Sequence, residues 1–161
     1  SGAPMEVNLF YRTVEREKAI AEVLYKAGAK EVLGVGDEAS DSIPEIGSER
    51  RRIDPRGIGS ADVVFVPLED GDRTEGLGGM GKTVITIDLN PLSRTARKAN
   101  ISIVDNIIRV IPLLNEAVEK LKDRKKEELE KITADFSNQH NLRASLDFIA
   151  DQLHSFSFEG E

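Results

Sequence analysis

Two short polar stretches near the middle of the chain have residue types suited to binding a nucleotide. Asp88, Leu89 and Asn90 follow one apolar run, and Asp105 and Asn106 follow the next. In an open α/β sheet, nucleotides bind at the carboxyl ends of the strands, because the helices that follow present unpaired N–H groups and a positive dipole to phosphate. We therefore expect the two stretches to form the two sides of one nucleotide site.

The runs in front of these stretches predict two neighbouring strands. Residues 83–87 are all β-branched, which is typical of a strand buried on both faces of a parallel sheet, and residues 101–104 repeat the pattern. Asn90 with Pro91 predicts a helix of about two turns ending at Ala99, since the asparagine can cap backbone N–H groups and proline at the first position loses no bond. Asn106 predicts the start of the next helix.

The remaining sequence places further strands and helices around this pair. Strands are expected over residues 5–10, 31–35 and 61–68. A helix is expected from Thr13 to Gly28, and Pro112 should kink or restart the helix that follows Asn106. Residues 36–60, rich in Gly, Ser, Asp and Arg, predict a long irregular loop. The fold class is therefore α/β, a Rossmann-like open, mainly parallel sheet with flanking helices and an α-helical carboxyl-terminal tail.

The chain is expected to divide into three parts. Residues 1–4 look like a linker or expression remnant, residues 5–121 should form the Rossmann-like nucleotide-binding domain, and residues 122–161 should form a helical tail. In the tail, two amphipathic helices over residues 127–136 and 142–156 should be joined by polar residues 137–141, which makes His140 a loop residue and His154 a helix-face residue. We expect the tail to serve packing or oligomer contacts rather than chemistry.

Composition excludes several functional classes. The 161 residues include no Cys and two His, both in the tail, so a thiolate nucleophile, Cys-ligated zinc and a Ser-His-Asp triad in the main domain are excluded. A net charge of −7 argues against nucleic acid as the main partner. No apolar run approaches the roughly 20 residues needed to cross a bilayer. We expect a cytoplasmic protein with no nucleic-acid or membrane partner, and we assign no residue as a metal ligand.

Clusters of charged residues suggest ligand binding, and each cluster also has a purely structural explanation. The basic clusters comprise Arg50, Arg51, Arg52 and Arg56, and then Arg94, Arg97 and Lys98. They suit a small anion, or they are solvated charges paired with Asp and Glu. The acidic run of residues 69–75 suits Mg²⁺ and phosphate, but for most of its acids a helix N-terminus capped by Asp72 is favoured.

Residues 76–83, with the sequence GLGGMGKT, match the phosphate-binding pattern of P-loop NTPases. A P-loop lies between a strand and a helix, whereas the residues after Thr83 predict a strand and those before Gly76 an acidic turn. We therefore interpret the motif as a glycine-rich helix end that leads into the strand. A helix over residues 84–88 would instead favour a P-loop NTPase.

Four ordered blocks carry a resemblance to a known family. They are residues 8–13 (NLFYRT), 66–75 (VPLEDGDRTE), 88–94 (DLNPLSR) and 103–107 (IVDNI). Together they resemble the archaeal phosphopantothenate synthetases, also called 4-phosphopantoate–β-alanine ligases, over most of residues 5–121. The resemblance implies a homodimeric enzyme of archaeal coenzyme A biosynthesis that joins 4-phosphopantoate to β-alanine and converts ATP, with Mg²⁺, to AMP and pyrophosphate.

By that resemblance, the nucleotide contacts fall on the two stretches described first. They are Asp88, Leu89, Asn90, Arg94, Thr95, Asn106 and Ile107. Arg50, Arg52 and Arg73 are candidates for holding the substrate phosphate, and no catalytic residue is assigned. The chemistry would pass through an acyl-adenylate, which needs positioned cations and N–H donors more than a proton-transfer residue.

This sequence departs from the family pattern in two ways. The family has a further segment before the first block, with arginines that touch ATP, so we expect this chain to be the carboxyl-terminal part of such an enzyme. Gly76, Gly78 and Gly79 also replace helix-forming residues. The alternative hypothesis is a non-catalytic nucleotide-binding or dimerisation module, and a P-loop NTPase is the third.

Overall fold

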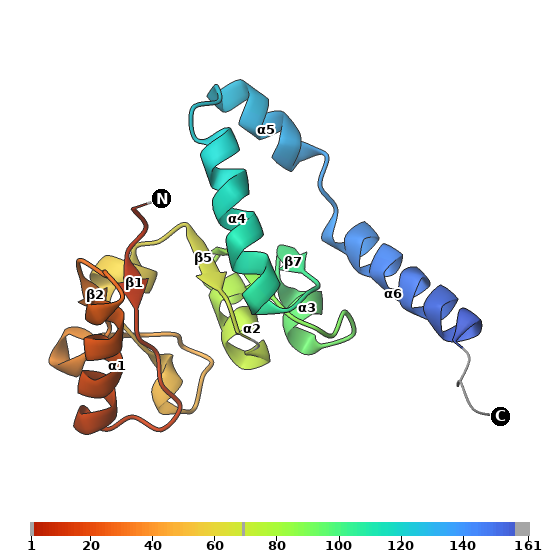
Figure 1. The fold of residues 1–161 in the computed structure, drawn as a ribbon. Coiled ribbons are helices and arrows are strands. Elements are labelled where there is room, and N and C mark those ends of the chain that lie inside the picture. The colour runs from red at the N-terminus through yellow and green to blue at the C-terminus, as the bar shows by residue number, and fades with distance from the viewer. Residues whose placement is uncertain (1, 69, 157–161) are drawn as a thin grey trace. The chain divides into compact units, whose positions relative to one another are not determined.

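A computed structural model describes residues 2–68 and 70–156 (Figure 1). The strands are β1 (Met5–Glu6), β2 (Val32–Leu33), β3 (Asp41–Ser42), β4 (Arg52–Ile53), β5 (Val63–Val66), β6 (Thr83–Ile87) and β7 (Ile101–Ile103). The α-helices are α1 (Val14–Lys26), α2 (Gly71–Gly79), α3 (Arg94–Lys98), α4 (Ile107–Leu121), α5 (Lys126–Ala134) and α6 (Asn138–Ser155). Between β2 and β5 lie two 3₁₀-helices, η1 (Gly36–Glu38) and η2 (Glu49–Arg51), and a π-helix, η3 (Pro55–Gly59). Ser1, Glu69 of the acidic run and residues 157–161 of the expected tail lie outside the described residues.

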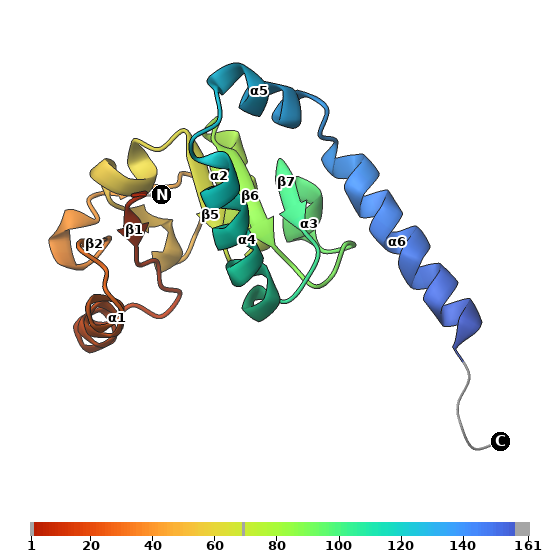
Figure 2. The same ribbon diagram turned by 45° about the horizontal axis from the view of Figure 1, so that its top comes forward.

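The described strands form small open sheets. β1 pairs in parallel with β2, β3 pairs antiparallel with β4, and a third sheet has the order β5-β6-β7. β6 and β7 are parallel, with Ile85 opposite Ile101, and Figure 2 shows β6 between its two neighbours. The predicted α/β class, with open sheets, parallel pairs and flanking helices, is thus confirmed, with the strands distributed over separate sheets.

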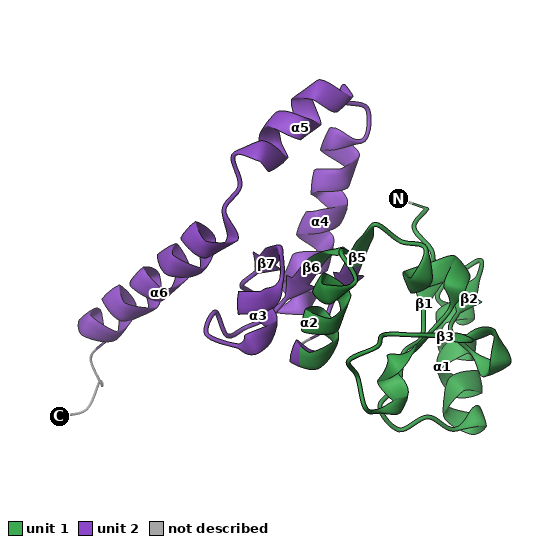
Figure 3. Ribbon diagram, turned by 180° about the vertical axis from the view of Figure 1, so that it is seen from behind, with its two compact units in different colours: residues 1–64, 72–84 green, residues 65–71, 85–161 purple. Residues whose placement is uncertain are grey.

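By its internal contacts, the chain divides into two compact units (Figure 3). Unit 1 comprises residues 1–64 and 72–84, and its buried core includes Ile43, Ile53, Leu77 and Val84. Unit 2 comprises residues 65–71 and 85–161, and its buried side chains include Val66, Ile87, Ala96 and Val110. The predicted boundary between residues 121 and 122 remains a prediction.

Helix α1 begins and ends where its sequence signals predict. Thr13 is the N-cap, and its hydroxyl accepts a hydrogen bond from the Arg16 N–H. Beyond the C-cap, Gly28 has a φ of +101°, a left-handed conformation that glycine adopts without steric cost. The N–H groups of Gly28 and Ala29 bond back to carbonyl oxygens of Tyr25 and Leu24, which completes a Schellman motif.

The helix expected directly after Asn90 begins later than predicted. Ser93 is the N-cap of α3, and residues 91–93 form a turn. The Asn90 side chain accepts from the Leu92 N–H at 2.9 Å and so closes a local turn instead of capping a helix. The prediction of Asn90 as the helix cap is therefore wrong, because the chain turns at residues 91–93 and the cap is Ser93, whose hydroxyl oxygen accepts from the Ala96 N–H.

The later helices confirm one cap and correct the joint between two helices. Asn106 caps α4 by accepting from the Ile108 N–H, and α4 then runs through Pro112 without restarting. Residues 138–141, expected in a polar connection, form the first turn of α6, because Ser137 accepts from the His140 N–H as the N-cap. His140 is therefore a helix residue.

The first turns of α6 are anchored to the rest of unit 2 by amide side chains. Asn138 Nδ2 donates to the carbonyl oxygens of Ala96 and Ala99, and its Oδ1 accepts from the Ser102 N–H, all within 3.0 Å. Asn141 Nδ2 donates to the Ser102 carbonyl at 2.8 Å. One end of α6 is thus fixed on α3 and β7.

The glycine-rich segment forms the end of a helix, as predicted from the sequence. α2 ends at Gly79, and Gly76 lies so close to Ile43 that an added Cβ would sit 2.6 Å from Ile43 Cγ2. The absence of a side chain therefore serves close packing at this position. α2 begins at Gly71, so Asp72 lies in its first turn and is not its cap, contrary to the prediction. Among the described residues, no helix is both long and apolar enough to span a membrane.

Candidate functional site

The carboxyl ends of β6 and β7 meet at one edge of unit 2. The two strands are parallel neighbours, and the Asp88 N–H donates to the Ile103 carbonyl at 3.0 Å just past their paired residues. A pocket of about 190 Å³ opens there. Its lining residues are Pro67, Leu68, Ile87, Asp88, Leu89, Asp105, Asn106 and Ile107. The predicted convergence of the two polar stretches is therefore confirmed.

The carboxylate of Asp88 organises the turn after β6. It is only 5% exposed, and its Oδ1 accepts from the Asn90 N–H at 2.8 Å. Its Oδ2 accepts from the Ser93 hydroxyl, whose oxygen in turn accepts from the Ala96 N–H as the cap of α3. The chain of hydrogen bonds fixes the turn and leaves Leu89, 66% exposed, beside the pocket.

The turn after β7 forms the second side of the pocket. Asp105 accepts from the Asn106 N–H at 2.6 Å and from Arg109 Nε at 2.8 Å. Hydrogen bonding from Arg109 is the main cause that lowers the pKa of Asp105, so this carboxyl stays ionised at neutral pH beside a compensating cation. Asn106 uses its side-chain oxygen to cap α4.

The structure brings together some of the predicted nucleotide contacts and not others. Asp88, Leu89, Asn106 and Ile107 all line the pocket, whereas Asn90, Arg94 and Thr95 are not among its lining residues. The Arg94 side chain is exposed and passes over Gly71, where an added Cβ would lie 3.0 Å from its Nε. Thr95 is fully buried, and its hydroxyl has no hydrogen-bond partner within the part of the chain that the structure describes. Nucleotide binding by these residues remains a prediction.

Two residues of the pocket were not predicted from the sequence. Pro67 and Leu68 follow β5 and line the same pocket, although they lie about twenty positions before Asp88 in the chain. Leu68 is 64% exposed and supplies an apolar wall. The available signal was that residues 61–68 already predicted a strand, whose end belongs at the same sheet edge once its neighbour is β6.

The candidate phosphate-binding arginines belong to unit 1. Arg50 lies over the Phe10 ring, 4.8 Å from its centroid, and pairs with Asp72 at 3.5 Å. Arg52 donates to the carbonyl oxygens of Ala39 and Gly36. Arg73 interacts electrostatically with the half-buried carboxyl of Glu6, whose pKa is raised mainly by desolvation. Substrate binding by Arg50, Arg52 and Arg73 remains a prediction.

Arg56 supports the alternative interpretation of the basic cluster, in which its charges are paired with Asp and Glu. It donates to both carboxylate oxygens of fully buried Asp54 and to Glu38, and it lies 3.6 Å from Glu31. Its charge is therefore taken up by acids of unit 1. The hydrogen bonds from Arg56 are the main cause that lowers the pKa of Asp54.

Replacing Arg56 by glutamine should make unit 1 more sensitive to acid. Because the pKa of Asp54 in the folded state is lowered from its ordinary value, its stabilising contribution is present above that ordinary value and is lost as the pH falls through the lowered pKa. Arg56→Gln removes the main cause of the lowered pKa of Asp54. The midpoint of acid unfolding, followed by circular dichroism, should therefore move to higher pH. Arg51→Gln is the control, since Arg51 makes no ion pair in the described part of the chain. An equal shift in both variants would contradict the assignment.

The P-loop interpretation of residues 76–83 is wrong for this fold. Thr83–Ile87 is strand β6 rather than a helix. Lys82 is buried, and its Nζ donates to the carbonyl oxygens of Gly59 and Ala61 at 3.0 and 2.8 Å. The lysine therefore ties loop backbone together within unit 1.

Lys82→Met should leave ATP affinity unchanged and should destabilise the fold. The variant leaves two carbonyl oxygens without their donor, which costs about 1–3 kcal/mol. Titration calorimetry with ATP and thermal unfolding would measure the two effects, with Lys120→Met on exposed α4 as the control. Loss of ATP binding in a fully folded Lys82→Met protein would restore the P-loop interpretation.

The described residues contain no group of three or more His, Cys, Asp or Glu side chains placed to hold a metal ion.

Comparison with known proteins gives a consistent set of relatives. The model of a family described as phosphopantothenate/pantothenate synthetase matches residues 1–152. A 4-phosphopantoate--beta-alanine ligase from Thermococcus kodakarensis is 50% identical over 159 residues, which cover 98% of this chain and 60% of that protein. The proteins of the same name from Thermococcus onnurineus and Methanosarcina mazei are 51% and 47% identical, over 94% and 99% of this chain and 58% and 62% of their own lengths. The chain thus spans about three fifths of the length of these curated relatives.

Proposed function

The chain belongs to the phosphopantothenate/pantothenate synthetase family, and from this premise we propose that it carries the nucleotide site of an ATP-dependent ligase. The proposed reaction joins 4-phosphopantoate to β-alanine through an amide bond and gives 4'-phosphopantothenate, AMP and pyrophosphate. This is a step of coenzyme A biosynthesis, and we place it in the cytoplasm, in keeping with a chain that has no cysteine.

One observation carries the assignment of the site: the turns after two adjacent parallel strands share a pocket. Leu68, Leu89 and Ile107 offer apolar surface to a base, and Asp88 and Asp105 offer oxygen atoms to ribose hydroxyl groups. The pocket, about 190 Å³, is smaller than the roughly 300–1,000 Å³ of typical ligand sites. It therefore suits one part of the nucleotide, and the triphosphate is left to side chains outside the pocket, among which Arg94 is our candidate.

The proposed chemistry has two displacement steps. A carboxylate oxygen of 4-phosphopantoate attacks the α-phosphorus of ATP, and pyrophosphate leaves with the electron pair of the broken P–O bond. The β-alanine amine then attacks the acyl carbon, loses a proton, and releases AMP. Positioned cations and N–H donors stabilise the charge that develops in both steps. Arg50, Arg52 and Arg73 are our candidates for the phosphate of 4-phosphopantoate.

Two measurements test the proposal. ATP should bind to the chain in titration calorimetry, and AMP release should require both 4-phosphopantoate and β-alanine. Arg94→Ala should weaken ATP binding, with Arg124→Ala on the surface after α4 as a matched control. AMP formation with either substrate omitted would contradict the ligase assignment.

The alternative is a non-catalytic nucleotide-binding or dimerisation module. Its support is the exposed apolar side chains on α6 and just beyond it, Phe148, Leu153 and Phe156, which suit a second copy of the chain. Under this alternative, Arg94→Ala would leave turnover unchanged. We propose a homodimer in either case, and sedimentation equilibrium would test it, with a monomeric mass at all concentrations as the contradicting result.

A further inference from the structure

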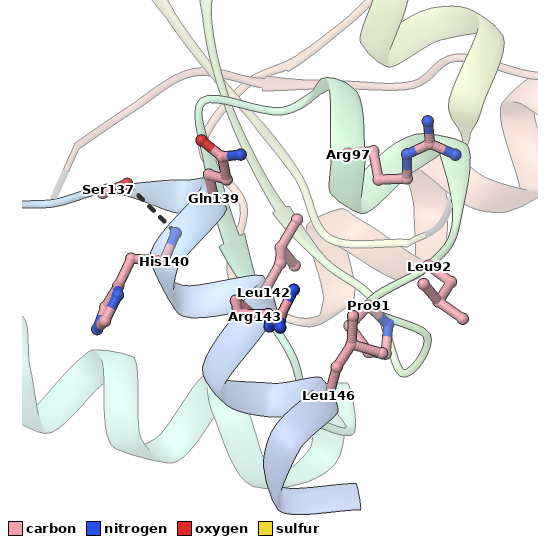
Figure 4. Close-up of a pocket in the computed structure, with 9 residues that line it drawn as sticks. All are labelled: Pro91, Leu92, Arg97, Ser137, Gln139, His140, Leu142, Arg143 and Leu146. Atoms are coloured by element: carbon pink, nitrogen blue, oxygen red, sulfur yellow. Dashed lines mark hydrogen bonds between the residues drawn. The ribbon is translucent and has the colours of Figure 1, made fainter. Parts of the chain in front are cut away.

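A larger cavity, about 520 Å³, lies within unit 2 between α3 and the first turns of α6 (Figure 4). Its lining residues are Pro91, Leu92, Arg97, Ser137, Gln139, His140, Leu142, Arg143 and Leu146. None of these described residues also lines the pocket at the ends of β6 and β7. The two are therefore separate sites on the same unit.

The lining combines an aliphatic surface with cationic side chains. Pro91, Leu92, Leu142 and Leu146 supply the aliphatic part, and Arg97 from α3 and Arg143 from α6 supply two guanidinium groups (Figure 4). Among the described residues that line the cavity, none has a carboxylate, although the chain as a whole has a net charge of −7. The cavity is thus locally cationic on an acidic protein.

One of the two arginines has an opposing charge beside it at the surface. Asp147, one turn along α6, lies with its Oδ1 3.4 Å from Arg143 Nε, and both side chains are more than 60% exposed. Exposed ion pairs of this kind contribute about 0–1 kcal/mol, so Arg143 can exchange this partner for a ligand at little cost. Arg97 has no carboxylate partner among the described residues.

The walls of the cavity are formed before any ligand binds. Asn138 and Asn141 bond α6 to the backbone of α3 and β7, and Ser137 caps the helix at the rim of the cavity. Leu142 is 9% exposed and packs inward from the same turns. A preformed site loses less conformational entropy on binding than one that must be assembled.

We propose that this cavity is a second small-molecule site, which binds an amphipathic anion: a phosphate or carboxylate group on a short aliphatic body. Guanidinium groups pair with such oxyanions through charge-assisted hydrogen bonds. The leucines and Pro91 remove the aliphatic body from water. The proposal does not depend on ATP binding at the other pocket.

The test uses n-hexyl phosphate as the probe and methyl NMR of the leucines as the readout. The probe should shift the methyl signals of Leu142 and Leu146 with saturation. Inorganic phosphate has only the anionic group and 1-hexanol has only the aliphatic chain. Each should therefore bind at least about tenfold more weakly than the probe. Saturating ATP should not displace the probe. Shifts confined to Leu89 and Ile107 would place the probe in the other pocket and overturn the proposal.

Substitutions on the two sides of the cavity separate specific binding from surface adsorption. Arg97→Gln and Arg143→Gln should each weaken binding of the probe about tenfold, and Asp147→Asn should strengthen it because it removes the competing carboxylate. Lys120→Gln on α4 is the control cation. Equal weakening by Lys120→Gln and Arg97→Gln would reduce the effect to net charge and overturn the proposal.

A competition experiment identifies the natural source of the anion. 4-Phosphopantoate has the proposed chemistry, with a phosphate, a carboxylate and a dimethyl-substituted carbon. If it displaces hexyl phosphate from Leu142 and Leu146, the cavity holds the substrate of the proposed ligase. If the probe stays bound, the cavity serves a separate effector. The competition experiment thus identifies the natural ligand. Whether the cavity binds an amphipathic anion at all is tested by the methyl shifts and the arginine variants.

Discussion

Replacing Asp88 by alanine should lower ATP affinity about 100-fold or more and lower the free energy of unfolding by about 2–4 kcal/mol. The carboxylate is buried and accepts from the Asn90 N–H and the Ser93 hydroxyl, so its removal leaves two donors without their acceptor. The turn that presents Leu89 to the pocket then loses its fixed conformation. Titration calorimetry with ATP and urea unfolding would measure the two effects, below the temperature at which the variant begins to unfold.

Two further variants show whether the turn itself is responsible. Ser93→Ala removes one of the two hydrogen bonds to Asp88 and the cap of α3, so its effect on ATP affinity should be intermediate. Asp151→Ala removes an exposed carboxylate of α6 and should change neither quantity. A folded Asp88→Ala protein with normal ATP affinity would show that the nucleotide binds elsewhere.

Glu17→Ala should strongly destabilise unit 1, with a loss of about 3–5 kcal/mol in the free energy of unfolding. Glu17 forms an ion pair with Arg12, and the two side chains are only 7% and 4% exposed. Glu17 also accepts from the Gly36 N–H at 2.7 Å, and Arg12 donates to the Gly34 carbonyl. Without Glu17, the guanidinium stays buried with its charge uncompensated. Urea unfolding followed by circular dichroism would measure the loss.

The same helix supplies a matched control for this prediction. Glu22 pairs with Lys26 on the exposed side of α1, and Glu22→Ala should cost less than about 1 kcal/mol. The double variant Arg12→Met/Glu17→Leu should recover most of the stability, because it removes both buried charges together. A loss in the double variant as large as in Glu17→Ala would show that the hydrogen bond to Gly36, rather than the charge on Arg12, sets the cost.

Features governed by neighbouring residues could be predicted from the sequence. The β-branched run of β6, the Thr13 and Asn106 caps and the Gly28 terminus all depend on contacts within a few positions, and the structure confirms them. The Asn90 cap failed although its side chain accepts from the N–H two positions on, as Asn106 does at the start of α4. The chain turns at residues 91–93 before α3 begins, and the cap is Ser93, whose hydroxyl is also bonded to Asp88.

Features that depend on distant residues could not be predicted. Leu68 lines the pocket because β5 lies beside β6. The structural role of Lys82 depends on its hydrogen bonds to two carbonyl groups more than twenty positions earlier. The amide of Asn138 likewise meets backbone groups near residue 100. In each case the residue type alone was compatible with several roles, and only the tertiary partner decides among them.

The anchoring of α6 by one end implies a gradient of local stability along that helix. Asn138, Asn141 and buried Leu142 fix its first turns, whereas Phe148, Leu153 and most other side chains beyond Leu146 are exposed. Among the described residues, fraying from the far end therefore breaks backbone hydrogen bonds and disturbs few buried side chains. Backbone amide protons should exchange with deuterium earliest near Ser155 and latest near Leu142, and a partner that covers the far half would abolish the gradient.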